Sequence, residues 1–234
     1  MTPILLYGFP LGSSMGLVAA LEWLGQPYRL SRVDMLNEMK NKAYARINDR
    51  LETPVLITAD ERVLTETMAI ALWLEARDVK RNTSFEPKTV ESERMHQFMA
   101  FLNTGFTAAF APLWIALEMN PPNEPAKKVY RELGCSRVIE RHNRLEAMLG
   151  DTPYLVGDRP TLADALLIGV SRWLDFHQIA DIDRWPRLAA LRRRIEALPA
   201  VQFAMALELD QGSPNSEVFL GHVALSDIIT RFGT

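Results

Sequence analysis

The sequence lacks the features that mark several classes of protein. A single cysteine, Cys135, allows no disulfide within the chain and fits a reducing compartment, so we expect a cytoplasmic location. The four histidines stand far apart rather than in the spacing of a metal site, and no metal is expected. No run reaches the roughly 20 apolar residues that span a bilayer, and no basic segment precedes an apolar one at the N-terminus. With a net charge of −3, the chain offers no broad basic surface, so neither nucleic acid nor a membrane is an expected partner.

What is present is an ordinary globular composition. The chain has 234 residues, of which 48% are hydrophobic and 24% charged, enough for one large domain or two small ones. The first 78 residues alternate between short apolar runs and helical patterns. Residues 4–7 predict a buried strand, residues 15–24 a helix ended by Gly25, and residues 28–33 a second strand. A strand, helix and strand of this length form a βαβ unit, so the two strands should be parallel.

The next stretch predicts a β-hairpin followed by a helix. After a short polar helix within residues 37–47, two apolar runs, 55–57 and 63–64, are joined by a charged turn. Pro54 opens the first run, where its missing N–H matters least, and a cis bond there would turn the backbone of Thr53 outward. Glu66 and Thr67 then open a helix to residue 76. Because the N–H groups of a helix N-terminus are unpaired, this junction suits a charged small molecule.

The second half of the chain predicts helices only. A polar linker, residues 79–89, precedes an all-helical domain at residues 90–209. It begins with one long amphipathic helix, 91–119, which Pro112 should kink, and continues with helices near 125–149, 187–197 and 199–209. Thr161 and Asp164 have the spacing of a capping box ahead of a buried helix. The tail, residues 210–234, has no assignment from the sequence.

Three motifs in this order resemble the cytosolic glutathione transferase family over roughly residues 4–209. Thr53-Pro54-Val55-Leu56 looks like the cis-proline strand start of the family, and residues 66–70 (ETMAI) look like its Glu/Gln-Ser-x-Ala-Ile motif. Residues 161–164 (TLAD) resemble its capping motif in the buried helix. The resemblance implies an N-terminal α/β thioredoxin-like domain (βαβαββα) followed by an all-α domain. It also implies a homodimer with glutathione as co-substrate, in a detoxification-type reaction in which the glutathione thiolate is joined to a small apolar electrophile or used to reduce it.

Residue matching then assigns expected glutathione contacts. In the family, the carboxylate and hydroxyl of the Glu-Ser pair hold the γ-glutamyl end, roles that fall here on Glu66 and Thr67. The residue before the cis-proline pairs its backbone with the cysteinyl part, which places Thr53 and Pro54 at the site.

The group that activates the thiol has three candidates. A free thiol has a pKa of about 8.5. A hydroxyl that donates a hydrogen bond to the sulfur, beside a helix N-terminus, stabilises the thiolate and lowers that pKa. Ser13 resembles the serine of the serine-type subclasses and is favoured, Ser14 is second, and Tyr7 resembles the position used by the tyrosine-type subclasses. The alternative is that a serine only caps the helix and that Tyr7 belongs to the core.

An apolar substrate would lie between the two domains. The possible wall residues are Phe9 and Leu11 from the first loop, with Phe106, Phe110 and Trp114 from the long helix. The alternative interpretation is that the helical stripe is plain core.

The loop before Pro54 departs from the family pattern. That loop usually resembles Asn-Pro-x-Gly-x-Val-Pro, whereas here Leu51 and Glu52 precede Thr53, and the proline and glycine are absent. Glu52 puts a negative charge where an anion would bind, and Arg50 is the nearest compensating group. This departure favours the rival hypothesis, a transferase-like binding or interaction protein without transferase activity. A thioredoxin-like oxidoreductase is disfavoured because the chain has no Cys-x-x-Cys motif.

Overall fold

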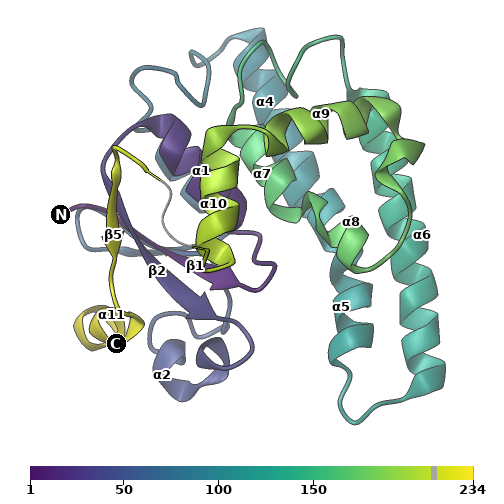
Figure 1. Ribbon diagram of the computed structural model, residues 1–234, viewed down its shortest axis with the longest axis horizontal. Helices are drawn as coiled ribbons and strands as arrows, with labels where there is room; N and C mark the ends of the chain where they lie inside the picture. Colours follow the sequence, from purple (N-terminus) through teal and green to yellow (C-terminus); the bar gives the residue numbers. More distant parts are fainter. Residues whose placement is uncertain (212–214, 234) are drawn as a thin grey trace.

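The computed structural model describes residues 1–211 and 215–233 (Figure 1). Its first part contains β1 (Ile4–Phe9), α1 (Met15–Leu24), β2 (Tyr28–Asp34), the 3₁₀ turn η1 (Glu38–Lys40), α2 (Lys42–Ala45), β3 (Val55–Ile57), β4 (Val63–Thr65) and α3 (Thr67–Glu75). Helix α1 ends as predicted at Gly25, whose φ of 70° is in the left-handed region and whose N–H donates to Leu21 O. The predicted order βαβαββα is confirmed.

Together with β5 (Phe219–His222) from the tail, these strands form one mixed sheet with the order β4-β3-β1-β2-β5. Strand β1 is parallel to β2, as the βαβ unit predicts, and antiparallel to β3, which pairs with β4 in the predicted hairpin. Alternate residues of β1 point to opposite faces. Leu5 and Tyr7 belong to the core shared with α1, α3 and the helical domain, whereas Ile4 and Leu6 belong to a second core on the other face.

The second part is a bundle of helices beside the sheet (Figure 1). It contains α4 (Val90–Phe101), a π-helical turn η2 (Leu102–Phe106), a 3₁₀ turn η3 (Thr107–Phe110), α5 (Ala111–Glu118), α6 (Glu124–Met148), α7 (Leu162–Ser171), α8 (Trp173–Phe176), the 3₁₀ turn η4 (Ile182–Arg184), α9 (Pro186–Glu196) and α10 (Pro199–Glu208). The predicted fold class, a thioredoxin-like domain followed by an all-helical domain, is confirmed.

The long helix predicted over residues 91–119, which Pro112 should kink, is helical along its length but is interrupted just before that proline. The α-helical pattern stops at Phe101 and resumes at Ala111, with the π-helical and 3₁₀ turns between them. Pro112 has no N–H to donate to the carbonyl of Ala108, and its ring crowds that carbonyl, so the strain is taken up over the preceding turns. By length and composition alone, the combined run from Val90 to Glu118 passes the test for a membrane-crossing helix. Core helices of globular proteins pass the same test, and Met95, Phe98 and Leu102 from this run are buried in the bundle.

Helix α7 is the buried centre of the molecule and carries the predicted capping box. The Asp164 carboxylate accepts hydrogen bonds from the N–H of Thr161 at 2.8 Å and from its hydroxyl at 2.9 Å. Helix α7 also lies directly against α1. A Cβ atom added to Gly169 would lie 2.3 Å from Ser13 O, and one added to Gly16 would lie 1.9 Å from Ala165 O. The two glycines therefore let the helices meet backbone to backbone.

The tail returns to the first part of the chain. Strand β5 (Phe219–His222) extends the sheet alongside β2, and α11 (Leu225–Phe232) lies on the same face of the sheet as α2 (Figure 1). Ile228 of α11 is buried against the second core, with Ile229 and Phe232 packed beside it.

Candidate functional site

A cavity of about 270 Å³ lies between the hairpin region and the helical domain. Four of the predicted ligand-binding residues line it together: Thr53, Pro54, Glu66 and Thr67. The remaining lining residues are polar groups of the preceding loop and residues of the helix interruption: Asn48, Arg50, Glu52, Asn103, Thr107 and Ala108. The cavity is therefore bordered by the hairpin, by the N-terminus of α3 and by the turns η2 and η3.

The hairpin side of the cavity has the backbone geometry that the sequence suggested. The Thr53–Pro54 peptide bond is cis. The Thr53 hydroxyl lies 3.4 Å from the sulfur of Met35 and close to Gly8, where an added Cβ would lie only 2.3 Å from that hydroxyl. A glycine at the end of β1 thus leaves room for the Thr53 side chain.

Charge in the cavity centres on Arg50. Its guanidinium forms an ion pair with Glu66 and lies 2.8 Å from the carboxylate of Glu52. The hydrogen bond to Glu66, and next the charge of Glu52, raise the pKa of Arg50. Arg50 therefore compensates Glu52, the residue that departs from the family pattern, and it also engages the predicted ligand-binding carboxylate. All three side chains are more than half exposed, so these pairs contribute little to stability and are available to a ligand.

The junction of β4 and α3 presents a helix N-terminus to the cavity. Glu66 has a φ of 74°, a left-handed conformation that non-glycine residues seldom adopt and that is concentrated at functional sites. Thr67 is the first residue of α3, where N–H groups have no partner within the helix. The exposed carboxylate of Glu66 and the donors at Thr67 can together hold an ammonium group and a carboxylate.

The three candidates for thiol activation have different surroundings, and none lines this cavity. The Ser14 side chain is buried, and its hydroxyl accepts a hydrogen bond of 2.9 Å from the N–H of Gly8 rather than capping α1. Tyr7 is 1% exposed, and its hydroxyl donates to Leu207 O at 3.3 Å and lies 3.2 Å from His222 Nε2. Burial raises the pKa of Tyr7 to about 12. Ser13 is partly exposed, with its backbone carbonyl against α7.

Side chains of the helical domain hold the loop that carries Ser13. Glu208 accepts a hydrogen bond from the N–H of Leu11, and the indole of Trp173 donates to Leu11 O at 2.8 Å. Arg172 donates to Gly12 O at 3.0 Å and forms an ion pair with Glu208. None of these three side chains is among the candidates that the sequence suggested. Only Glu208 left a signal, as an acidic residue on the buried face of α10 that Val201 and Ala204 define.

The predicted wall residues divide into two groups. Phe106 and Phe110 are 1% and 0% exposed and pack in the core, for example against His142. Both rings are therefore buried below the molecular surface. Trp114 is partly exposed and packs edge-on against Trp173, with ring centroids 5.3 Å apart.

The first loop supplies the remaining wall candidates. The Phe9 ring is covered by the guanidinium of Arg32 at 3.4 Å, and Leu11 is partly exposed. Through Trp173, the loop at Leu11 is connected to the accessible aromatic side chain of Trp114.

No group of three or more potential metal ligands occurs within residues 1–211 and 215–233. The chain's cysteine, Cys135, is partly buried on α6.

Comparisons with known proteins identify the family. The N-terminal domain family of glutathione S-transferases matches residues 14–77, and the C-terminal domain family matches residues 113–199. Glutathione S-transferase GST-4.5 of Xanthomonas campestris is 25% identical over 203 residues, 87% of this chain and 98% of the relative. Glutathione S-transferase GstA of Escherichia coli O157:H7 is 23% identical over 79% of this chain and 88% of the relative. A glutathione transferase structure from Methylococcus capsulatus is 31% identical with a TM-score of 0.71, covering 88% of this chain and 98% of that one. The chain belongs to the glutathione S-transferase family.

Proposed function

We propose that this protein is a glutathione transferase that binds glutathione in the cavity between the hairpin and η2. The observation that carries the proposal is the convergence of Thr53, Pro54, Glu66 and Thr67 on one cavity at the N-terminus of α3. The γ-glutamyl ammonium group pairs with Glu66, and its carboxylate accepts from Thr67. The backbone of Thr53 pairs with the cysteinyl part.

Arg50 has a second role in this proposal. It lies between Glu52 and Glu66 and cancels part of the negative charge that would otherwise repel the glycine carboxylate of glutathione. The departure from the family pattern at Glu52 is in this way offset by a neighbour.

Ser13 is the proposed activating hydroxyl. Ser14 already accepts from Gly8, and Tyr7 points to Leu207 and His222, whereas Ser13 is partly exposed just before α1. Its hydroxyl donates to the glutathione sulfur and stabilises the thiolate. The thiolate forms a bond to an electrophilic carbon of a small apolar compound, and the displaced group leaves with its bonding electrons. Leu11, Trp114 and Trp173 provide the apolar wall for that compound. The enzyme acts in the cytoplasm as a homodimer. Sedimentation of the purified chain would test the dimer.

A titration and a turnover assay test this proposal. Calorimetric titration should give one glutathione site per chain, and conjugation to a chloronitrobenzene should be detectable by absorbance. Ser13→Ala should lower kcat by at least roughly tenfold with a small change in KM, since the hydroxyl acts on the thiolate. Glu66→Gln should raise the KM for glutathione, whereas Glu217→Gln, an exposed control in the tail, should change neither constant.

A transferase-like binding protein without catalytic activity is the second candidate. Two observations favour this candidate: Glu52 lines the glutathione cavity, and Ser13 is not among the residues that line that cavity. Glutathione binding without turnover would support this candidate, and failure to bind glutathione at millimolar concentration would overturn the first.

A further inference from the structure

The described end of the tail, residues 215–233, packs on the sheet at the face that α2 covers. Strand β5 pairs with β2, and the N–H of Val223 donates to Leu30 O at 2.7 Å. Helix α11 then lies on the same face as α2 (Figure 1), with Ile228 1% exposed in the second core. Both matched family domains end before residue 200, so this part of the chain lies outside the matched residues.

The tail contacts α2 through a hydrogen bond and through apolar packing. Arg46, the residue that ends α2, donates to Gly233 O at 2.8 Å. The apolar side chains of α11 belong to the same cluster as Ile47 and as Tyr44, the buried side chain of α2. Loss of α11 would therefore remove part of the packing that holds Tyr44 in place.

Tyr44 and Asn48 fix the loop that precedes Pro54. The Tyr44 hydroxyl donates to Glu52 O at 2.8 Å, and the side-chain amide of Asn48 donates to the same carbonyl at 2.9 Å. The amide oxygen of Asn48 accepts from the N–H of Arg50 at 3.2 Å. Tyr44 and Asn48 are 0% and 5% exposed, so two buried side chains hold this one carbonyl.

The carbonyl of Glu52 determines the direction of the next N–H group. The Glu52–Thr53 peptide bond is trans, and in a trans peptide the C=O and N–H groups point in opposite directions. Because Glu52 O is held towards Tyr44, the N–H of Thr53 points away from Tyr44, and Thr53 lines the glutathione cavity. The same loop contains Arg50, which pairs with Glu66. The position of this loop therefore governs the backbone of Thr53 and the charge of Arg50 together.

We propose that the tail is a clamp that positions the glutathione-binding loop, residues 48–53, with Tyr44 and Asn48 as the positioning residues. The proposal rests on the proposed function, which assigns this loop to glutathione. The tail holds α2, and Tyr44 of α2, together with Asn48, holds the carbonyl of Glu52. When the tail is loosened, the loop spends less time in the arrangement that binds glutathione, and the apparent affinity falls in proportion.

Tyr44→Phe tests the positioning role, because it keeps the buried ring and removes the donor to Glu52 O. The dissociation constant for glutathione, measured by calorimetry, should rise roughly threefold to tenfold. The kcat at saturating glutathione should stay within about twofold, since Ser13 lies on another loop. Ser84→Ala is the matched control: it removes a buried hydroxyl that donates to Asp78 at 2.8 Å and should leave the glutathione affinity unchanged. Equal affinities of parent and folded Tyr44→Phe would overturn the proposal.

Ile228→Ala tests the clamp from the side of the tail. It shortens the buried side chain of α11 and should weaken glutathione binding at least roughly threefold, because the loop is less often in place. Ile195→Ala is the matched control, since Ile195 of α9 is 0% exposed and its truncation leaves a cavity of the same kind. It should lose stability without losing glutathione affinity. Equal affinity losses in the two variants would show a general effect of destabilisation and would overturn the proposal.

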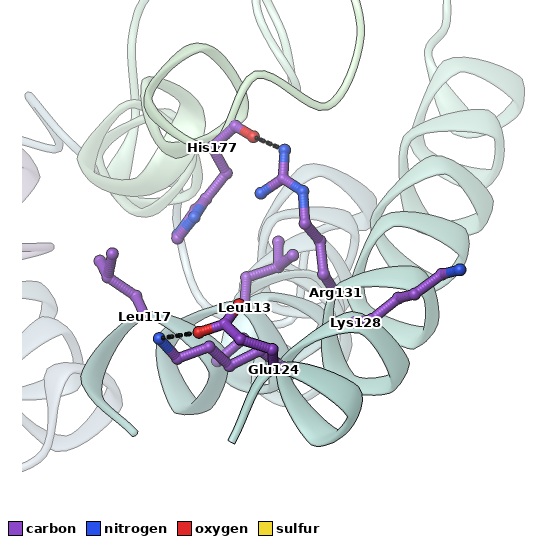
Figure 2. A pocket seen from close by; sticks show the side chains of 8 residues that line it. Leu113, Leu117, Glu124, Lys128, Arg131 and His177 are labelled. Carbon is purple, nitrogen blue, oxygen red and sulfur yellow. Dashed lines mark hydrogen bonds and ion pairs between the residues drawn. The ribbon is translucent and has the colours of Figure 1, made fainter. Parts of the chain in front are cut away.

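A pair of exposed arginines provides a test that leaves the core intact. Arg46→Gln removes the bond to Gly233 O, and Arg131→Gln removes a bond of the same kind, to His177 O in the helical domain (Figure 2). At about 0.3 M salt, which screens the lost charges, Arg46→Gln should weaken glutathione binding roughly twofold or more. Arg131→Gln should not weaken it, and equal affinities of the two variants would count against the clamp.

Amide hydrogen exchange separates this proposal from the proposed function, because it needs no glutathione. Exchange within residues 48–53 should be faster in Tyr44→Phe and Ile228→Ala than in the parent, and unchanged in Ile195→Ala. If the parent fails to bind glutathione at millimolar concentration, the proposed function fails, whereas faster exchange in these two variants still supports the clamp. Unchanged exchange in both folded variants would overturn the clamp whether or not glutathione binds.

Discussion

Replacing Glu208 should destabilise both the fold and the loop that carries Ser13. Glu208 is 4% exposed at the end of α10, where its carboxylate pairs with Arg172 and accepts from the N–H of Leu11. The Arg172 side chain is itself only 16% exposed, and its Nε has no partner among the described residues. The Glu208→Leu variant would therefore leave a mostly buried guanidinium without its counter-ion, together with a backbone N–H without an acceptor.

The expected size of this effect follows from those contacts. Removing one partner of a buried ion pair costs about 3–5 kcal/mol, because the remaining charge stays desolvated. Arg172 retains its bond to Gly12 O and some contact with solvent, so we expect the lower part of this range, about 3 kcal/mol, in the free energy of unfolding. That is a large fraction of the ~5–15 kcal/mol that stabilises a typical domain.

Urea denaturation followed by circular dichroism measures this loss. Glu208→Gln keeps an oxygen for the Leu11 N–H and should lose less, about 1–2 kcal/mol. In the double variant Arg172→Met/Glu208→Leu no charge is left unpaired, so its loss should be smaller than the sum of the single losses. Glu217→Gln serves as the exposed control. Two results together would refute the idea that this pair anchors the loop. One is a loss below about 1 kcal/mol in Glu208→Leu, and the other is a loss in the double variant equal to the sum of the losses in Arg172→Met and Glu208→Leu.

Three further predictions follow from buried polar groups. Tyr7→Phe should lose about 1 kcal/mol of stability with the bond to Leu207 O, and its turnover should stay within roughly twofold of the parent; a turnover loss of tenfold would assign the thiol-activating role to Tyr7. Ser14→Ala should lose about 1–3 kcal/mol in urea denaturation, because it leaves the Gly8 N–H without its acceptor, and unchanged stability would contradict that bond. Burial lowers the pKa of His142 from 6.5 to about 4, so the unfolded chain takes up a proton on acidification before the folded chain does. The contribution of His142 to stability should therefore be full above pH 6.5 and fall by about 3 kcal/mol down to pH 4, so stability should depend less steeply on pH in denaturation curves of His142→Leu than in those of the parent.

Local sequence signals were enough to predict the hairpin side of the site. The Thr53–Pro54 pair, the short strands and the Glu66–Thr67 junction lie within fifteen residues, and each depends on turn chemistry or helix capping between near neighbours. The capping box of Thr161 and Asp164 was predictable for the same reason, since both partners lie within one helical turn.

The tail could not be placed from its own sequence. Strand β5 has only four residues, one of them Gly221, and it exists because β2 offers an edge for pairing. Helix α11 has eight residues, too few to be stable alone, and is held by contacts of Ile228 with the second core. Both elements depend on partners nearly two hundred residues away, which no local pattern encodes.

The same distinction separates the two halves of the candidate site. The residues that favour glutathione binding are close in sequence, whereas the Ser13 loop is held by Arg172, Trp173 and Glu208, which lie about 160 to 200 residues downstream. A serine at position 13 therefore provides the chemistry of a hydroxyl, but the helical domain fixes where its loop lies. It follows that substitutions in the two halves of the candidate site should have different effects. Substitutions at Glu66 should act on glutathione affinity alone, while substitutions at Glu208 should lower stability and turnover together.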